Sequence, residues 1–165
     1  MILRPETADD VPAIRTLITD AFRDSPHGGG NEGVIVDALR DDGALSVSLV
    51  ADENGELAGH VAFSKALIDA RNLDWYGLGP VAVKAPYRRR GIGAALIKAG
   101  LKRIKDLGGR GCVVLGEPAY YGRFGFECDP HLRLAGVPPE YFQRLIISGA
   151  PPSGLVTYHR AFDEA

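Results

Sequence analysis

The stretch at residues 78–107, LGPVAVKAPYRRRGIGAALIKAGLKRIKDL, constrains the fold most, because it joins a strand, a basic glycine turn and a long helix without interruption. The apolar run at residues 81–83, with two β-branched valines, is typical of a strand, whereas apolar residues recur at helical spacing over residues 96–107. The period changes inside residues 88–93, RRRGIG. The chain must therefore contain a strand that leads through this turn directly into a helix.

The turn at residues 88–93 has the composition of a phosphate site. Gly91 and Gly93 have no side chains that would keep a ligand away from the backbone, and three consecutive arginines add positive charge. The first N–H groups of a helix lack intrahelical partners, and the helix dipole favours an anion there. The turn is thus predicted to bind a pyrophosphate; the plainer alternative is a surface arginine cluster at an ordinary helix start.

Composition places limits on the function. A chain of 165 residues with 45% hydrophobic and 24% charged residues suits one soluble domain over residues 1–165. The net charge of −2 argues against nucleic acid as a partner. No signal-like start or apolar run long enough for a bilayer is present, so we expect no membrane partner and a cytoplasmic protein with reduced cysteines.

Periodicity and turn residues predict alternating strands and helices. Expected strands lie at residues 2–4, 45–51, 57–65, 75–83, 111–115 and 155–162, with another beginning at residues 126–128. Expected helices lie at residues 11–22, 91–107, 119–124 and, as a helical turn, 140–145, with one more that buries Val34, Ile35, Ala38 and Leu39.

The dipeptide Gly79-Pro80 interrupts the central strand. Proline cannot donate a ladder hydrogen bond, so the sequence predicts a bulge or local break there. Backbone groups left unpaired by that break would be free to face a ligand.

Two motifs together resemble one known family. Residues 88–93 fit a [Gln/Arg]-x-x-Gly-x-[Gly/Ala] pyrophosphate turn, and residues 121–126, YGRFGF, fit a Tyr-x-x-x-Gly-Phe element after the next strand. In this order the motifs resemble the Gcn5-related N-acetyltransferase (GNAT) family, and residues 116–126 resemble its YhbS-type bacterial branch. The resemblance implies the α/β (α+β) acyl-CoA acyltransferase fold. That fold has a mixed, mostly antiparallel twisted sheet of about 6–7 strands, flanked by about four helices and splayed between its fourth and fifth strands.

The resemblance also implies a co-substrate, acetyl-CoA, and its contacts. Backbone N–H groups of the turn would hold the pyrophosphate, and the central strand would pair with the pantetheine arm as an added strand would. The residues assigned to the coenzyme are Val81, Ala82, Val83, Arg88, Arg89, Arg90, Gly91, Ile92, Gly93, Ala94, Tyr121 and Phe124.

Acetyl transfer to an amine needs a proton for the departing thiolate, and Tyr121 is the assigned general acid. A phenol with a pKa of about 10 is protonated at neutral pH and can donate to a thiolate whose thiol resembles cysteine, at about 8.5. Tyr120 is the alternative acid. A main-chain N–H of Val81 or Ala82 would meet the oxyanion. The general base stays open among water and four side chains: Glu32, His60, Glu117 and His131.

The acceptor is expected to be a primary amine of a small molecule or a peptide, held by a monomer or homodimer. Variable loops at residues 27–32, 66–74 and 131–141 would form its walls, and Asn31 and Glu32 are polar enough to hold a cation. The sequence has no Gly-x-x-x-x-Gly-Lys-[Ser/Thr] loop, Gly-x-Ser-x-Gly turn or zinc-spaced Cys/His set, so no metal is expected. The alternative function is a non-catalytic coenzyme A-binding sensor or interaction module.

Overall fold

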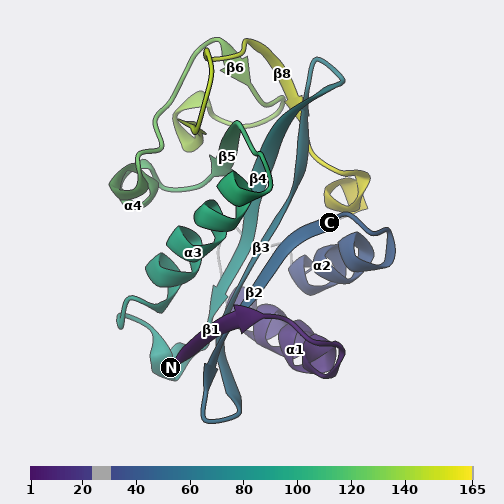
Figure 1. The fold of residues 1–165 in the computed structure, drawn as a ribbon, viewed down its shortest axis with the longest axis vertical. Helices are drawn as coiled ribbons and strands as arrows, with labels where there is room; N and C mark the ends of the chain where they lie inside the picture. Colours follow the sequence, from purple (N-terminus) through teal and green to yellow (C-terminus); the bar gives the residue numbers. More distant parts are fainter. Residues whose placement is uncertain (24–30, 165) are drawn as a thin grey trace.

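The computed structural model describes residues 1–23 and 31–164, which form one twisted sheet with helices on both faces (Figure 1). The strands are β1 (Ile2–Pro5), β2 (Leu45–Glu53), β3 (Glu56–Ile68), β4 (Arg71–Val83), β5 (Gly111–Leu115), β6 (Leu132–Arg133), β7 (Phe142–Ile146) and β8 (Gly154–Thr157). The α-helices are α1 (Val11–Phe22), α2 (Glu32–Asp41), α3 (Ile92–Asp106) and α4 (Pro118–Tyr121). No helix in these ranges is both long and apolar enough to cross a membrane.

The sheet runs in the order β1-β2-β3-β4-β5-β7, with β8 pairing to the far end of β3 and β6 pairing to β8. The pairs along this order are antiparallel except β4 with β5, which is parallel and short. The predicted mixed, mostly antiparallel sheet is therefore confirmed. The described sheet has eight strands, where six or seven were predicted. One of them, β6, is only two residues long.

The predicted break at Gly79-Pro80 is a bulge in β4. Val81 pairs with Val61 of β3 and Leu78 pairs with Phe63, so two residues of β4 lie opposite the single residue between those β3 positions. Beyond the bulge the register is regular to Val83. The bulge divides β4 into an N-terminal part, beside β5, and a C-terminal part that leads to α3.

Alternation along β3 decides which helix covers which face. Gly59 and Phe63 lie under α3, where a Cβ on Gly59 would meet Ile92 and Leu96 at 3.0 Å. Ala62 points to the opposite face and packs with the apolar side of α1. Because side chains of a strand alternate, β3 anchors α3 on one face and α1 on the other.

The second helix was predicted with one wrong buried residue. Ile35 and Leu39 are buried as expected, but Val34 is 44% exposed and Val36 is fully buried instead. Val36 packs with α1 while Ile35 and Leu39 face Ala161 near the C-terminus. The helix therefore has two partners, and its buried face is turned further than one apolar stripe indicated.

The C-terminal third contains the larger corrections. Residues 126–128 form no strand but one isolated bridge, between Glu127 and Arg144. The helical turn expected at residues 140–145 is only Pro139–Tyr141, after which Phe142–Ile146 pairs with β5 as a strand. The expected closing strand ends at Thr157 and is followed by a short 3-10 helix, Arg160–Glu164.

We expect Gly100→Ala to lower the free energy of unfolding by about 1–3 kcal/mol, although alanine is the better helix former. A Cβ at this position of α3 would lie 2.1 Å from Cε1 of the buried Phe63 ring. Urea unfolding would measure the change. The matched control is Gly122→Ala, because a Cβ there meets nothing within 4 Å. Equal stability of the two variants would contradict the close packing of α3 on β3.

Candidate active site

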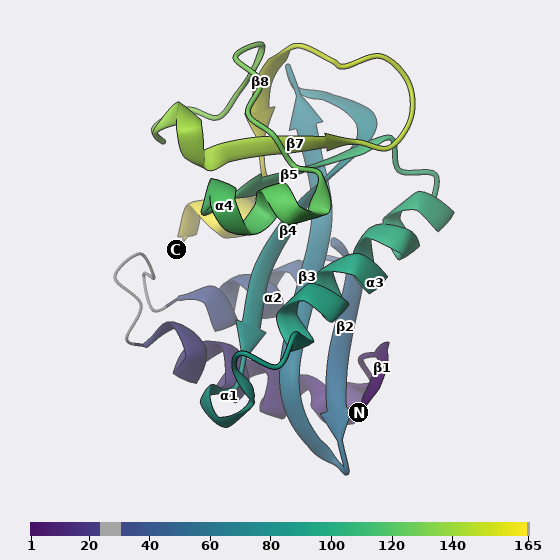
Figure 2. The same ribbon diagram turned by 90° about the vertical axis from the view of Figure 1, so that its left-hand side faces the viewer.

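A split in the sheet begins where β4 and β5 stop pairing. Their ladder has three residue pairs and ends at Gly77 and Val113. Beyond that point β5 continues to Leu115 against β7, while β4 continues to Val83 against β3. Figure 2 shows β4 running away from β5, with α3 and α4 on the viewer's side of the sheet. The C-terminal part of β4 therefore has one edge that no described strand covers.

The alternation of β4 determines which backbone groups lie on that open edge. The N–H of Lys84 bonds to the carbonyl of Ala58 on β3 at 2.8 Å. Counting back in the regular antiparallel register, Ala82 also directs its N–H and C=O to β3. Val81 and Val83 then direct theirs to the open edge, and the Val83 carbonyl accepts a hydrogen bond from Arg88 Nε at 3.2 Å.

The open edge of β4 leads to the N-terminus of α3. Gly91 is the N-cap residue with a φ of 78°, a left-handed conformation that glycine adopts without strain. The first carbonyl to accept an intrahelical bond is that of Gly91, from Ala95 N–H at 3.0 Å. The N–H groups of residues 91–94 precede this bond and are available to a ligand.

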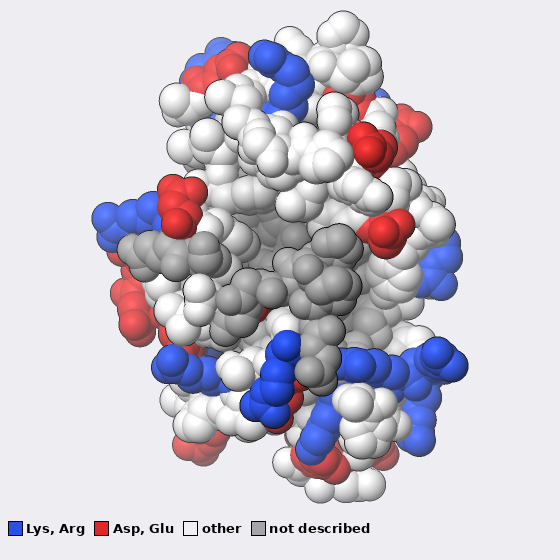
Figure 3. All heavy atoms as spheres, turned by 180° about the vertical axis from the view of Figure 1, so that it is seen from behind, with Lys and Arg blue, Asp and Glu red and all other residues white. Residues whose placement is uncertain are grey.

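The three arginines at the start of this turn are exposed, and they differ in their contacts. Arg88 is turned back toward β4 through its bond to Val83. Arg90 lies over the ring of Tyr87, 5.4 Å from its centroid. Arg89 has a φ of 65°, which belongs to the tight turn itself. In the view from behind, Lys and Arg side chains are concentrated across the lower part of the molecule (Figure 3).

Tyr121 lies on the other side of the split, on α4. Its ring fills the space beside Gly116, where a Cβ would lie 2.4 Å from Tyr121 Cε2, and it meets Phe126 edge-on at 6.0 Å. Burial, with smaller contributions from Tyr120 and Cys112, raises the pKa of Tyr121 to about 12. The hydroxyl is therefore protonated across the neutral range.

Tyr120 and Phe124 complete an aromatic cluster with Tyr121. The rings of Tyr120 and Tyr121 stand edge-on, with centroids 5.0 Å apart and an interplanar angle of 88°. Phe124 lies 5.5 Å from Tyr120 and 6.4 Å from Tyr121. The sequence left the two tyrosines as alternatives, and the structure directs them to different places: Tyr120 reaches toward Gly93, whereas the Tyr121 ring packs beside Gly116.

The expected acceptor residues lie at the start of α2. Asn31 is its exposed N-cap residue, with its backbone carbonyl bonded to Ile35 N–H at 3.1 Å, and Glu32 is the first helical residue. Residues 27–30 of the predicted wall lie outside the described residues. The walls at residues 66–74 and 131–141 belong to the β3–β4 hairpin and to the segment from β6 to β7.

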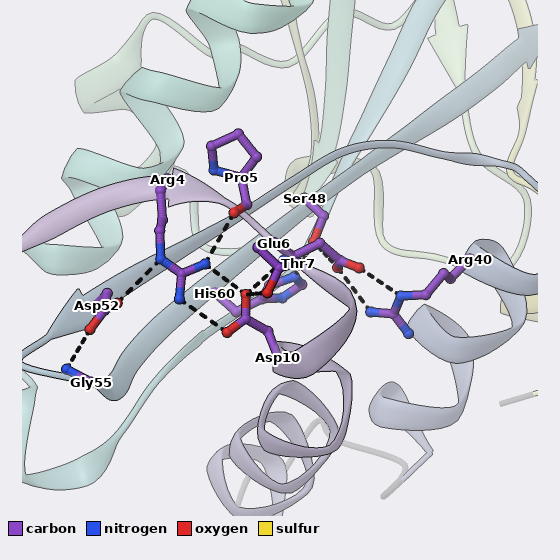
Figure 4. A network of polar contacts seen from close by, with 10 residues as sticks. All are labelled: Arg4, Pro5, Glu6, Thr7, Asp10, Arg40, Ser48, Asp52, Gly55 and His60. Atoms are coloured by element: carbon purple, nitrogen blue, oxygen red, sulfur yellow. Dashed lines mark hydrogen bonds and ion pairs between the residues drawn. The ribbon is translucent and has the colours of Figure 1, made fainter.

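The candidate bases differ in how far they are buried. Glu117 and His131 are exposed, and Glu117 is the N-cap residue of α4. His60 is fully buried on β3, on the face covered by α1 and α2 (Figure 4). Among the described groups, its Nδ1 atom has no hydrogen-bond partner.

The buried His60 belongs to a partly buried polar network that the sequence did not reveal. Arg40 Nε and Nη2 bond to the carboxylate of Glu6 at 2.7 and 2.9 Å, and the Ser48 hydroxyl donates to the same carboxylate. His60 Nε2 lies 2.8 Å from Ser48 Oγ. Because the single hydroxyl proton goes to Glu6, the Nε2–H of His60 must be the donor to Ser48. These four residues are far apart in the sequence, so no local spacing could predict the network.

Burial keeps His60 neutral within this network. Burial lowers the pKa of His60 to about 4, with an opposing contribution from Glu6 and a supporting one from Arg40. Burial would raise the pKa of Glu6, but its bonds to Arg40 and Ser48 outweigh this effect and lower it. The network thus joins α2, β2, β3 and the segment directly after β1 around one ion pair.

Comparisons with known proteins agree with this geometry. The profile of the acetyltransferase (GNAT) family matches residues 11–126, which contain both the α3 turn and Tyr121. The chain belongs to the GNAT family. The predicted family and fold are therefore confirmed, and so is the enzyme class, an N-acetyltransferase.

Individual GNAT relatives are similar over the full length. The uncharacterized N-acetyltransferase YhbS of Escherichia coli K12 is 35% identical over 170 residues, covering 99% of both chains. A GNAT acetyltransferase of Brucella melitensis, crystallised with acetyl-CoA, is 44% identical with a TM-score of 0.89, covering 98% of this chain and 97% of that one. E. coli YhbS crystallised with CoA is 34% identical with a TM-score of 0.88, covering 98% and 91%.

In this GNAT chain, we expect His60→Gln to weaken the loss of stability on acidification. The pKa of His60 is about 4 in the folded protein against 6.5 as the reference value. The unfolded chain therefore binds more protons between these pH values, and the free energy of unfolding falls as pH drops from about 6.5 to about 4. This contribution is about 3 kcal/mol.

Urea unfolding at several pH values would measure this effect as the slope of stability against pH. The exposed His131→Gln is the control and should keep the wild-type slope. Parallel pH dependence of the wild type and His60→Gln would contradict a neutral buried His60.

Proposed function

We propose that this protein transfers the acetyl group of acetyl-CoA to a primary amine of a small molecule or peptide. The observation that carries the proposal is the open edge of β4, which runs from the bulge to the free N–H groups of α3. Coenzyme A matches this order, because its extended pantetheine arm can pair with a strand edge and the pyrophosphate that follows can accept hydrogen bonds from helix N–H groups. The Brucella relative with acetyl-CoA and the YhbS complex with CoA support this ligand.

In the proposed complex, Val81 and Val83 pair with the amide groups of pantetheine. The pyrophosphate lies on the N–H groups of residues 91–94, and the side chain of Arg90 adds charge beside it. Arg88 already bonds to the Val83 carbonyl, so it reaches the phosphates only by leaving that bond. We call the space between the open edge of β4 and α4 the slot. Phe124 packs with Tyr121 at its aromatic end, on α4 and the turn that follows.

The reaction follows from these positions. The lone pair of a neutral amine attacks the thioester carbonyl, forming the C–N bond and a tetrahedral oxyanion. The N–H of Val81 is the oxyanion donor, because Ala82 directs its own N–H to β3. When the C–S bond breaks, the electron pair goes to sulfur and Tyr121 supplies the proton. The positively charged nitrogen loses one proton to water to give the neutral amide, and the Tyr121 phenolate regains a proton from solvent. The products are the amide and free coenzyme A.

Water is the proposed acceptor of the amine proton. The Nε2–H of His60 donates to Ser48, and burial holds the imidazole beneath α1 and α2, away from solvent. Glu117 and His131 are exposed and lie in no buried cluster. An alkylamine with a pKa of about 10.4 is mostly protonated at neutral pH, so deprotonation is required before attack. We further infer a cytoplasmic enzyme, in keeping with two free cysteines.

We expect Tyr121→Phe to lower kcat by about 100-fold, because one positioned general acid is lost, while the Kd for acetyl-CoA stays within about twofold. Thiol release from acetyl-CoA across a panel of polyamines, amino acids and peptides would measure turnover. Since the pKa of Tyr121 is about 12, the wild-type rate should rise with pH without an acid-loss limb below pH 10. Full turnover by Tyr121→Phe would remove the acid role, and binding without any thiol release would favour the sensor alternative.

We expect Arg90→Ala to raise the Kd for acetyl-CoA by about three- to tenfold, since a charge beside the pyrophosphate is lost. Isothermal titration at two salt concentrations would measure the change, which should shrink at high salt. Lys98→Ala removes an exposed charge from the middle of α3 and is the control. Equal affinities of the two variants would show that Arg90 points away from the coenzyme.

A further inference from the structure

The hydroxyl of Tyr120 lies beside the first turn of α3. A Cβ built on Gly93 would lie 3.2 Å from Tyr120 Oη and 3.5 Å from Val83 Cγ2. Gly93 is the second residue of α3, so the phenol reaches the first turn of that helix. Tyr121, by contrast, packs on Gly116 and Phe126.

This contact crosses the split in the sheet. Tyr120 belongs to α4, which follows β5, whereas Gly93 and Val83 belong to α3 and β4. The two halves separate after Gly77 and Val113 and meet again at the tip of this side chain. A ligand lying in the slot with its pyrophosphate on α3 would pass directly beside the phenol.

The Tyr120 ring is held in place, but its hydroxyl is not bonded. The Arg123 guanidinium lies 4.4 Å from the ring centroid, and Arg123 Nε bonds to the Tyr120 carbonyl at 3.2 Å. Tyr121 and Phe124 pack edge-on against the same ring. Within the described ranges no protein group hydrogen-bonds to the half-buried Tyr120 hydroxyl. It is thus a fixed donor without a protein partner.

We propose that Tyr120 donates a hydrogen bond to the pyrophosphate of acetyl-CoA and so closes the slot from the α4 side. The proposal rests on the acetyl-CoA site described above. It gives the two adjacent tyrosines separate roles: Tyr120 positions the phosphates and Tyr121 serves the thiolate. It also gives Gly93 a second reason to be glycine, because a side chain there would crowd the phenol as well as the phosphates.

The test compares three acetylated ligands that differ in how much of the nucleotide part of coenzyme A they retain. Acetyl-CoA and its 3′-dephospho form both carry the pyrophosphate, and S-acetylpantetheine does not. We expect Tyr120→Phe to raise the Kd for acetyl-CoA and 3′-dephospho-acetyl-CoA by about tenfold, because one hydrogen bond to a charged group is lost. The Kd for S-acetylpantetheine should change by less than about twofold. Titration calorimetry, with ligand-observed NMR for the weak ligand, would give the Kd values.

Tyr141→Phe is the matched control, because it makes the same chemical change, the loss of a phenol hydroxyl, at an exposed tyrosine. Thermal unfolding would establish that Tyr120→Phe keeps the wild-type stability. Unchanged affinity for all three ligands would overturn the proposal, and equal weakening of all three would overturn it by placing the hydroxyl on pantetheine. If the wild type bound no acetyl-CoA, the acetyltransferase proposal would fail first, so the two failures are distinguishable.

Discussion

The separation of β4 from β5 is the constraint on which the rest of the site depends. The two strands pair over three residues, and the bulge at Gly79-Pro80 then shifts the register of β4 against β3. Proline has no N–H to continue a ladder, and the extra residue bends the strand. The result is a strand edge inside a sheet, where hydrogen-bonding groups would otherwise all be paired.

Both helices beside the split gain their roles from that edge. The C-terminal part of β4 leads through the arginine turn into α3, so the open strand edge is followed directly by the unpaired N–H groups of the helix. β5 leads through Gly116 into α4, which brings two tyrosines to the other side. Phe63 under Gly100 and the apolar side of α1 under Ala62 hold β3 between them and keep this geometry rigid.

The sequence predicted features whose causes are local. The bulge follows from one proline, the α3 turn from two glycines, and β5 from a short apolar run at residues 111–115. Features that depend on distant partners were missed. Phe142–Ile146 becomes a strand only because β5 offers an edge, and the network of His60 joins four residues that lie far apart in the sequence. Likewise, no spacing could tell Tyr120 from Tyr121, because their difference lies in what each ring meets across the fold.

The most direct test of the central claim is a titration of the labelled protein with acetyl-CoA, followed by backbone amide NMR shifts. The open-edge account predicts the largest shifts at Val81 and Val83 on β4 and at residues 91–94 of α3. Ala82 should shift less, since its N–H stays with β3. Large shifts confined to other surfaces, such as the roughly 520 Å³ groove that Ser46 of β2 lines together with Lys102 of α3, would contradict the account.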